Sequence, residues 1–264
     1  MFKFSDDLNY SMPAHFGGHE GPARALSYGD VTTIRISYET DAELLAHNVP
    51  EDFEITQGIV TVAYAMCREV DWMAGGGYSL ISVSVPVAYD CAGQRIEGQY
   101  ILVIWENKTC PILGGRETTG IPKVFADIEE HHQLLDRAFT NASYEGREFL
   151  RVGFQRKQQI PPEALATMSQ THGQLNQLGW RYIPNIGGPG AALSHATLYP
   201  VDIAIRSGWL GEGRVDWQTL TWEQHPTQAH IINALARLPV NGYRDCAMTH
   251  GSQVLRLDLA RRLP

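Results

Sequence analysis

Long runs of alternating apolar and polar residues constrain the fold of this chain more than any other feature. Residues 31–38, Val-Thr-Thr-Ile-Arg-Ile-Ser-Tyr, are rich in β-branched side chains and alternate as a half-buried strand does. Further strand-like runs follow at residues 59–67, 78–89, 99–106, 125–129, 143–155, 196–206, 214–223, 242–248 and 253–259. Long strands joined locally favour a predominantly antiparallel sheet.

A few helices are predicted to cover this sheet. The first follows Thr40 or Asp41, either of which can cap it, and ends at Pro50. A second opens at residues 161–166 with proline at its start, and a third spans residues 227–238 with its apolar residues on one face. No repeat or linker divides the chain, so we predict one α+β domain, mainly antiparallel β, over residues 1–264.

The composition indicates a soluble globular protein with a small-molecule partner. The chain is 44% hydrophobic and 19% charged, and its formal net charge of -8 argues against a general nucleic-acid or anionic-membrane surface. No apolar run approaches the roughly 18 residues needed to span a bilayer. The N-terminus lacks the order of a signal peptide, so we expect a cytoplasmic protein.

Metal and organic cofactors are not expected. The four cysteines are scattered without a Cys-x-x-Cys pair, which indicates neither a zinc site nor a disulfide framework. Residues 115–120 have part of the spacing of a phosphate loop, but Ile121 and Pro122 stand where that loop needs lysine and serine or threonine. The glycines of residues 115–120 are therefore interpreted as turn residues.

Lys123 is the candidate nucleophile. The chain has seventeen arginines but four lysines, and Lys123 lies in the apolar frame Ile-Pro-Lys-Val-Phe at residues 121–125. A lysine beside apolar residues most often snorkels or lies at a sheet edge, with its ammonium in water. If the backbone instead carries Lys123 into a closed pocket, desolvation favours the neutral amine, which forms Schiff bases.

Around Lys123 the sequence resembles the acetoacetate decarboxylase family. The likeness begins at Gly-Arg-Glu (residues 115–117) and Pro122-Lys123, and it extends through residues 38–54, the Ile-Pro-Asn at 183–185, Trp-Leu-Gly at 209–211 and Leu-Pro-Val at 238–240. The resemblance implies a cone-like or barrel-like antiparallel sheet around a lysine that forms an imine with a ketone. It also implies a homo-oligomer, a tetramer or larger.

The sequence departs from that family at three places. Decarboxylating members carry a second lysine after the first, where this chain has Val124. Their pocket glutamate aligns with Leu80, and their pocket arginine has no clear counterpart in the strand from Val31. Only desolvation by Ile121, Val124, Phe125 and the barrel lining is then expected to activate Lys123.

The resemblance to members without the second lysine favours an aldolase-dehydratase. Such an enzyme condenses pyruvate or a related 2-keto acid with an aldehyde through an imine and an enamine, and then eliminates water. Two alternatives stay open: a decarboxylase of β-keto acids such as acetoacetate, and a non-catalytic protein that binds a small carbonyl compound.

Other site residues are assigned to roles around Lys123. Arg116 is predicted to bind the keto acid's carboxylate, and Glu117, Tyr78 or Tyr243 to carry protons. Thr119 and Leu80 complete the predicted substrate contacts. Each has a plain alternative, since Arg116 and Glu117 can pair with each other and both tyrosines can be core aromatics.

Overall fold

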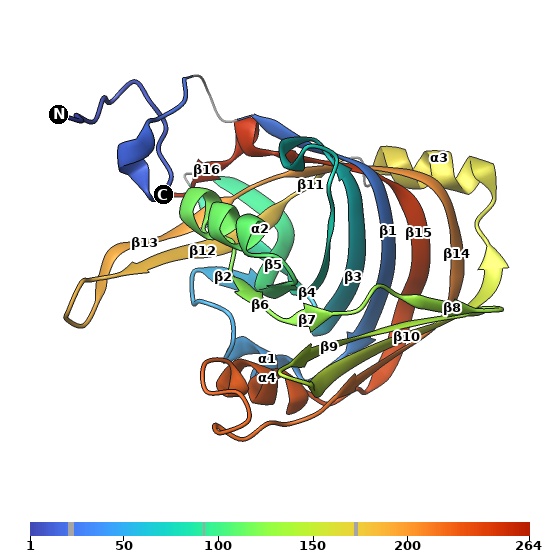
Figure 1. Cartoon of the computed structure of the whole chain (residues 1–264). Coiled ribbons are helices and arrows are strands. Elements are labelled where there is room, and N and C mark those ends of the chain that lie inside the picture. Colours follow the sequence, from blue (N-terminus) through green and yellow to red (C-terminus); the bar gives the residue numbers. More distant parts are fainter. Residues whose placement is uncertain (21–23, 92, 172–173) are drawn as a thin grey trace.

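The structure, a computed structural model, describes residues 1–20, 24–91, 93–171 and 174–264. Figure 1 shows long curved strands with short helices at their ends. The helices are α1 (Ala42–Ala46), α2 (Thr109–Gly114), α3 (Pro162–Thr171) and α4 (Ala229–Ala236), with 3₁₀ turns η1 (Ala14–Phe16), η2 (Asp71–Met73) and η4 (Leu257–Leu259) and a π-helical turn η3 (Gly115–Thr119). No helix in these ranges is long and apolar enough to cross a membrane.

Sixteen strands of the described residues form one mainly antiparallel sheet. Its long members are β1 (Ala25–Glu39), β3 (Ile59–Val70), β4 (Tyr78–Cys91), β5 (Gln94–Glu106), β9 (Arg137–Tyr144), β10 (Arg147–Gln159), β12 (Gln177–Pro184), β13 (Ala191–Leu198), β14 (Val201–Trp217) and β15 (Gly242–Arg256). The short ones are β2 (Phe53–Ile55), β6 (Lys123–Phe125), β7 (Asp127–Ile128), β8 (His132–Leu134), β11 (Gln174–Leu175) and β16 (Arg261–Arg262).

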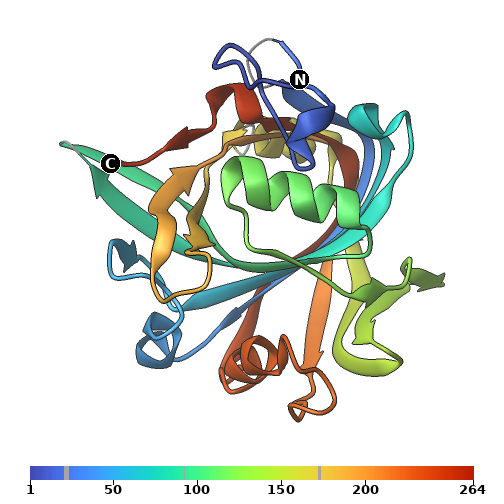
Figure 2. The same ribbon diagram turned by 60° about the vertical axis from the view of Figure 1, so that its left-hand side comes forward.

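The sheet curls, with its strands in the order β16-β13-β12-β5-β4-β3-β1-β15-β14-β10-β9-β7. In Figure 2 the strands form a ring, and the green helix that contains α2 lies across its centre. Strands β6 and β12 pair with β5 in parallel, while the other pairings are antiparallel among the described strands. The α+β class and the mainly antiparallel, barrel-like sheet are confirmed.

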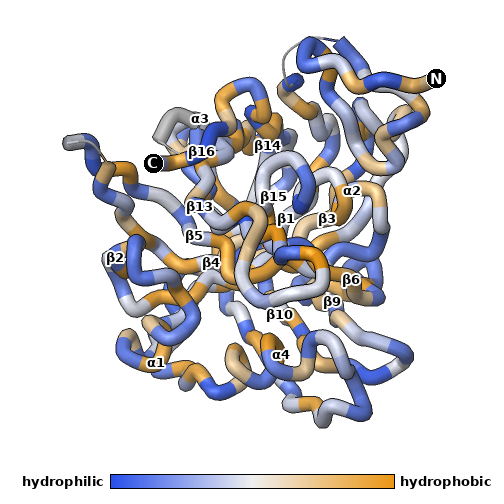
Figure 3. The backbone as a smooth tube through the Cα atoms, turned by 90° about the vertical axis from the view of Figure 1, so that its left-hand side faces the viewer, coloured by the Kyte–Doolittle hydropathy of each residue, from blue (hydrophilic) through white to orange (hydrophobic). Residues whose placement is uncertain are grey.

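The two faces of the curled sheet have different roles. On β1, the side chains of Ile34, Ile36 and Tyr38 are fully buried in the largest hydrophobic cluster, which also takes in Trp105 of β5 and Ile232 of α4. The alternate residues of the same strands face a cavity. Figure 3 shows the hydrophobic stretches gathered at the centre of the molecule. Strand alternation thus separates a packed core from a hollow interior.

Several strand boundaries differ from those predicted. The run 143–155 is two strands, because Glu145 and Gly146 form a turn with positive φ. Strand β14 joins part of the run 196–206 to the start of the run 214–223, and β15 joins the run 242–248 to the start of the run 253–259, whose last three residues form η4. The interval between the last two predicted runs contains Gly251, where a Cβ would lie 2.0 Å from the carbonyl oxygen of Ala204. Glycine there permits close strand contact rather than a turn.

The three predicted helices are present, and the first and third are shorter than predicted. Asp41 caps α1, since its Oδ1 accepts hydrogen bonds from the backbone amides of Glu43 and Leu44 at 2.9 and 3.1 Å. The helix itself ends at Ala46, before Pro50. Helix α4 covers the core face through Ile232 and Leu235.

Candidate active site

Lys123 lies inside the molecule at the start of β6. Its side chain is 6% exposed, and β6 pairs in parallel with β5 so that Lys123 is opposite Ile104. Behind this strand, Gln228 at the start of α4 accepts a hydrogen bond from Trp105 at 2.7 Å and donates one to the carbonyl of Phe125 at 3.0 Å. The strand is therefore held from the core side while Lys123 faces the cavity.

A buried carboxylate lies against Lys123. Its Nζ is 2.8 Å from Oε1 of Glu106, whose side chain is 0% exposed, and Nζ also donates to the carbonyl of Pro111 at 3.2 Å. Apart from Lys123, no described group bonds either oxygen of this carboxylate. Burial raises the pKa of Glu106, and the charge and hydrogen bond of Lys123 act in the opposite direction. Glu106 is thus a buried acid whose one described partner is the candidate nucleophile.

Glu106 was missed by sequence reasoning. The family's pocket glutamate was aligned with Leu80, and that position is indeed apolar; however, Leu80 of β4 pairs directly with Glu106 of β5. The carboxylate is therefore supplied by the neighbouring strand. The one available signal was a glutamate closing the apolar run at residues 100–105, which we interpreted as the end of a strand.

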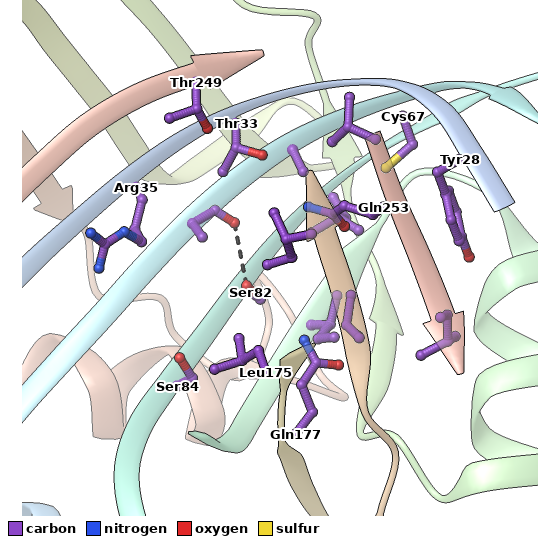
Figure 4. Close-up of a pocket in the computed structure, with 18 of the residues that line it drawn as sticks. Tyr28, Thr33, Arg35, Cys67, Ser82, Ser84, Leu175, Gln177, Thr249 and Gln253 are labelled. Carbon is purple, nitrogen blue, oxygen red and sulfur yellow. Dashed lines mark hydrogen bonds between the residues drawn. The ribbon is translucent and has the colours of Figure 1, made fainter. Parts of the chain in front are cut away.

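The cavity has a volume of about 360 Å³, within the range of small-ligand sites. Figure 4 shows part of its wall, with Thr33 and Arg35 projecting from β1 and Ser82 and Ser84 from β4. Much of the lining is apolar, including Ile104 and Ile121 beside the lysine. Within the described part of the chain, three charged side chains line it: Arg35, Glu106 and Lys123.

Arg35 corrects a second expectation, because a pocket arginine does come from the strand that contains Val31. It lines the cavity with Val31 and Thr33, on the opposite face of β1 from Ile34 and Ile36. The alternation of residues 31–38 already places Arg35 on the same face of the strand as Val31 and Thr33.

A pair of tyrosines closes the cavity near Glu106. Tyr78 donates a hydrogen bond to the hydroxyl of Tyr28 at 3.3 Å, and both line the cavity. Burial raises the pKa of Tyr28 to about 12 and holds the pKa of Tyr78 well above its usual value. Both hydroxyls therefore stay protonated at neutral pH and can donate a hydrogen bond. Of the predicted proton carriers, Tyr78 is at the cavity.

The other predicted site residues are not all beside Lys123. Leu80 lines the cavity, whereas Arg116, Glu117, Thr119 and Tyr243 are not among its lining residues. Arg116 is exposed and donates to the carbonyl of Lys123 at 3.0 Å, and the hydroxyl of Thr119 donates to the carbonyl of Gly115 at 2.9 Å. Arg116 and Thr119 thus fix the loop that carries the lysine.

Glu117 and Tyr243 have other surroundings. The backbone carbonyl of Glu117 accepts a hydrogen bond from Arg181. Tyr243 is 41% exposed, and its hydroxyl accepts from the amide of Val215 at 3.0 Å. The structure therefore does not bring Tyr243 to the nucleophile.

The apolar frame of Lys123 is also only partly as predicted. Ile121 is buried at the cavity, but Val124 is half-buried and Phe125 is 37% exposed. Desolvation of Lys123 therefore comes mainly from the curled sheet and from α2 across its mouth. Among the described residues, no group of three or more His, Cys, Asp or Glu side chains is placed to hold a metal ion.

Gly115 makes room for the lysine. A Cβ at this position would lie 2.7 Å from both Cδ and Cε of Lys123, although its φ of -65° suits any residue. We expect Gly115→Ala to displace the amine and lower its reaction with a carbonyl compound by about a hundredfold. Gly114→Ala is the matched control, because a Cβ there meets no atom within 4 Å. Equal rates of borohydride-trapped adduct in the two variants would show that this contact does not matter.

A family model and several known proteins match this sequence. The sequence model of the family described as acetoacetate decarboxylase matches residues 11–255. An acetoacetate decarboxylase of Burkholderia cenocepacia (strain HI2424) is 26% identical over 223 residues, covering 83% of this chain and 80% of that protein.

Two solved structures show the same fold at low sequence identity. The acetoacetate decarboxylase of Legionella pneumophila superposes with a TM-score of 0.76 at 19% identity, covering 99% of this chain and 98% of that one. The enduracididine biosynthesis enzyme MppR, complexed with the condensation product of pyruvate and imidazole 4-carboxaldehyde, has a TM-score of 0.72 at 13% identity, covering 98% and 97%.

Proposed function

This chain belongs to the acetoacetate decarboxylase family, an enzyme family, and from that premise we propose that it is a Schiff-base lyase that joins a 2-keto acid such as pyruvate to an aldehyde and then removes water. The observation that carries the proposal is the buried pair of Lys123 and Glu106, with 2.8 Å between Nζ and Oε1, at a cavity of about 360 Å³. It places a nucleophile and a base side by side in one buried position.

The first step needs a neutral amine. Burial raises the pKa of Glu106, and in the proposed first step this carboxylate takes a proton from Lys123. The amine then attacks the ketone carbon of the keto acid. Loss of water, with the acid returning a proton to the leaving oxygen, gives the imine.

The second step needs a base near the imine. Glu106, again a carboxylate, lies 2.8 Å from the nitrogen that forms the imine, and we assign to it the removal of a proton from the adjacent methyl group. Removal of a methyl proton moves the electron pair toward the protonated imine and forms an enamine. The enamine carbon bonds to the aldehyde carbon, and the aldehyde oxygen takes a proton to become a hydroxyl.

The last steps remove that hydroxyl as water and hydrolyse the imine. The protonated hydroxyls of Tyr78 and Tyr28 can hold the oxygen through this sequence, because they lie at the same cavity as Glu106. Overall, one keto acid and one aldehyde give one unsaturated keto acid and one water. The pyruvate condensation product bound by MppR, which has the same fold, supports this reaction class.

Decarboxylation of a β-keto acid is the second candidate, favoured by the curated relatives named acetoacetate decarboxylase. Loss of carbon dioxide from an imine requires no base, whereas the condensation requires one to form the enamine. Glu106, 2.8 Å from the amine, supplies a base for the condensation, although a pocket glutamate also belongs to the decarboxylating members that this chain resembles.

A product assay separates the two reactions. Pyruvate mixed with an aldehyde is expected to give a new absorbance from a conjugated, unsaturated keto acid. Acetoacetate is expected to release little carbon dioxide. Rapid carbon dioxide release without any condensation product would instead establish the decarboxylase.

A further inference from the structure

We propose that the aldehyde partner carries a carboxylate, or a similar planar anion, and that Arg35 binds this group across the cavity from Lys123. This inference rests on the proposed lyase function and adds the chemical class of the second substrate.

The charges of the cavity point to an anion. Lys123 and Glu106 neutralise each other at 2.8 Å, so Arg35 is the surplus charge among the described residues that line the cavity. Arg35 is exposed, and in the described part of the chain its guanidinium has no hydrogen bond or ion pair. An unpaired guanidinium facing a ligand cavity presents two parallel donors that match a carboxylate.

The sheet register places Arg35 at a definite distance from the lysine. Arg35 pairs with Ala63, Ala63 with Ser82, Ser82 with Ile104, and Ile104 with Lys123. Arg35 and Lys123 are therefore in one row, four strand spacings apart, or roughly 19 Å along the sheet at about 4.8 Å per spacing. Because the sheet curls around the cavity, the direct distance is shorter.

The wall between the two groups leaves room for a ligand. Ala63 and Ser82 are small, and the hydroxyl of Ser82 is turned to the carbonyl of Ala63 at 3.4 Å. The hydroxyls of Thr33, Thr61 and Ser84 also line the cavity. Ser84 already donates to Oε1 of Gln99 at 3.3 Å, and Thr61 shares a hydrogen bond of 2.9 Å with Ser37, whereas Thr33 can donate to an anion beside Arg35 (Figure 4).

The cavity volume agrees with a second substrate of this length. Pyruvate has roughly six non-hydrogen atoms and fills at most about half of the cavity, if each atom takes the ~30 Å³ share of a water molecule. Arg35 lines the same cavity as Lys123, so it borders the space that pyruvate leaves free. A chain of several carbons with an aldehyde at one end and a carboxylate at the other fits this space and its charge.

The test compares glutarate semialdehyde with pentanal, which has the same carbon count and no charge. With pyruvate as the first substrate, the wild-type protein is expected to have a higher kcat/KM for glutarate semialdehyde than for pentanal. Arg35→Met should lower the ratio of these two kcat/KM values roughly ten- to hundredfold, mainly by raising the KM for glutarate semialdehyde. Arg147→Met removes an exposed charge of β10 outside the cavity and should leave the ratio unchanged. An equal ratio in wild-type protein and Arg35→Met overturns the proposal.

A second readout needs no turnover and separates this proposal from the lyase itself. Borohydride should trap 2-oxosuberate on Lys123 at lower concentration than 2-oxooctanoate, and Arg35→Met should remove the difference. If the wild-type protein forms adducts with both compounds at the same concentration, the proposed role of Arg35 is overturned, but the lyase function is not. No adduct with any keto acid, pyruvate included, would overturn the lyase.

Discussion

Lys123→Ala is expected to abolish condensation of pyruvate with an aldehyde, lowering turnover by at least about 10⁴-fold. No other residue supplies the electron pair that forms the imine, so the loss reflects the covalent step rather than weaker binding. The measurement is the rate of unsaturated product under saturating pyruvate. Residual turnover within tenfold of wild type would show that Lys123 is not the nucleophile.

Stability must be controlled in this experiment. Lys123→Ala leaves the Glu106 carboxylate buried without its partner, and breaking a buried pair costs about 3–5 kcal/mol of folding free energy. The double variant Lys123→Ala with Glu106→Gln removes the orphaned charge and should recover much of this loss in urea unfolding. Both variants should be inactive, although only the single one is strongly destabilised. Lys157→Ala, at an exposed pair with Glu212, controls for the loss of a lysine charge.

Glu106→Gln is expected to lower kcat by about 10²- to 10⁴-fold, because it removes the general base while keeping the volume of the side chain. The neutral amide cannot accept the methyl proton, although imine formation with pyruvate should survive at a reduced rate. Exchange of the methyl protons of pyruvate with deuterated water measures the lost step directly. Exchange at the wild-type rate in Glu106→Gln would assign the base elsewhere. Glu212→Gln, at an exposed site on β14, is the matched control.

The pH dependence follows from the same carboxylate. Burial raises the pKa of Glu106, so the wild-type rate should fall, as pH decreases, already above the range in which an ordinary glutamate is protonated. The base must be ionised for proton removal, and activity is therefore lost on the acid side. This acid limb should be absent from the residual activity of Glu106→Gln.

The sheet could be predicted from local patterns because strand alternation is a short-range signal. Residues 31–38 alternate, and the structure places Ile34 and Ile36 in the core and Thr33 and Arg35 at the cavity. The boundaries of β14 and β15 could not be predicted, since the role of Gly251 depends on Ala204 of the next strand. A glycine required by close packing looks in sequence like a glycine required by a turn.

The nucleophile could be predicted from the sequence, but most of the residues that surround it could not. The apolar frame and the motif shared with a family identified Lys123, and Tyr78 was placed on the correct strand. Glu106 is 17 residues earlier in the chain and reaches Lys123 only through the parallel pairing of β5 with β6. Such pairing is a long-range property. Comparison with relatives position by position also fails to identify a carboxylate that a neighbouring strand supplies.

Borohydride reduction in the presence of pyruvate, followed by mass measurement of the intact chain and its peptides, tests the central claim most directly. The account predicts one added reduced pyruvate, located on Lys123 and absent from Lys123→Ala. A folded wild-type protein that gains no mass with pyruvate or acetoacetate, or that carries the adduct on another lysine, would contradict it.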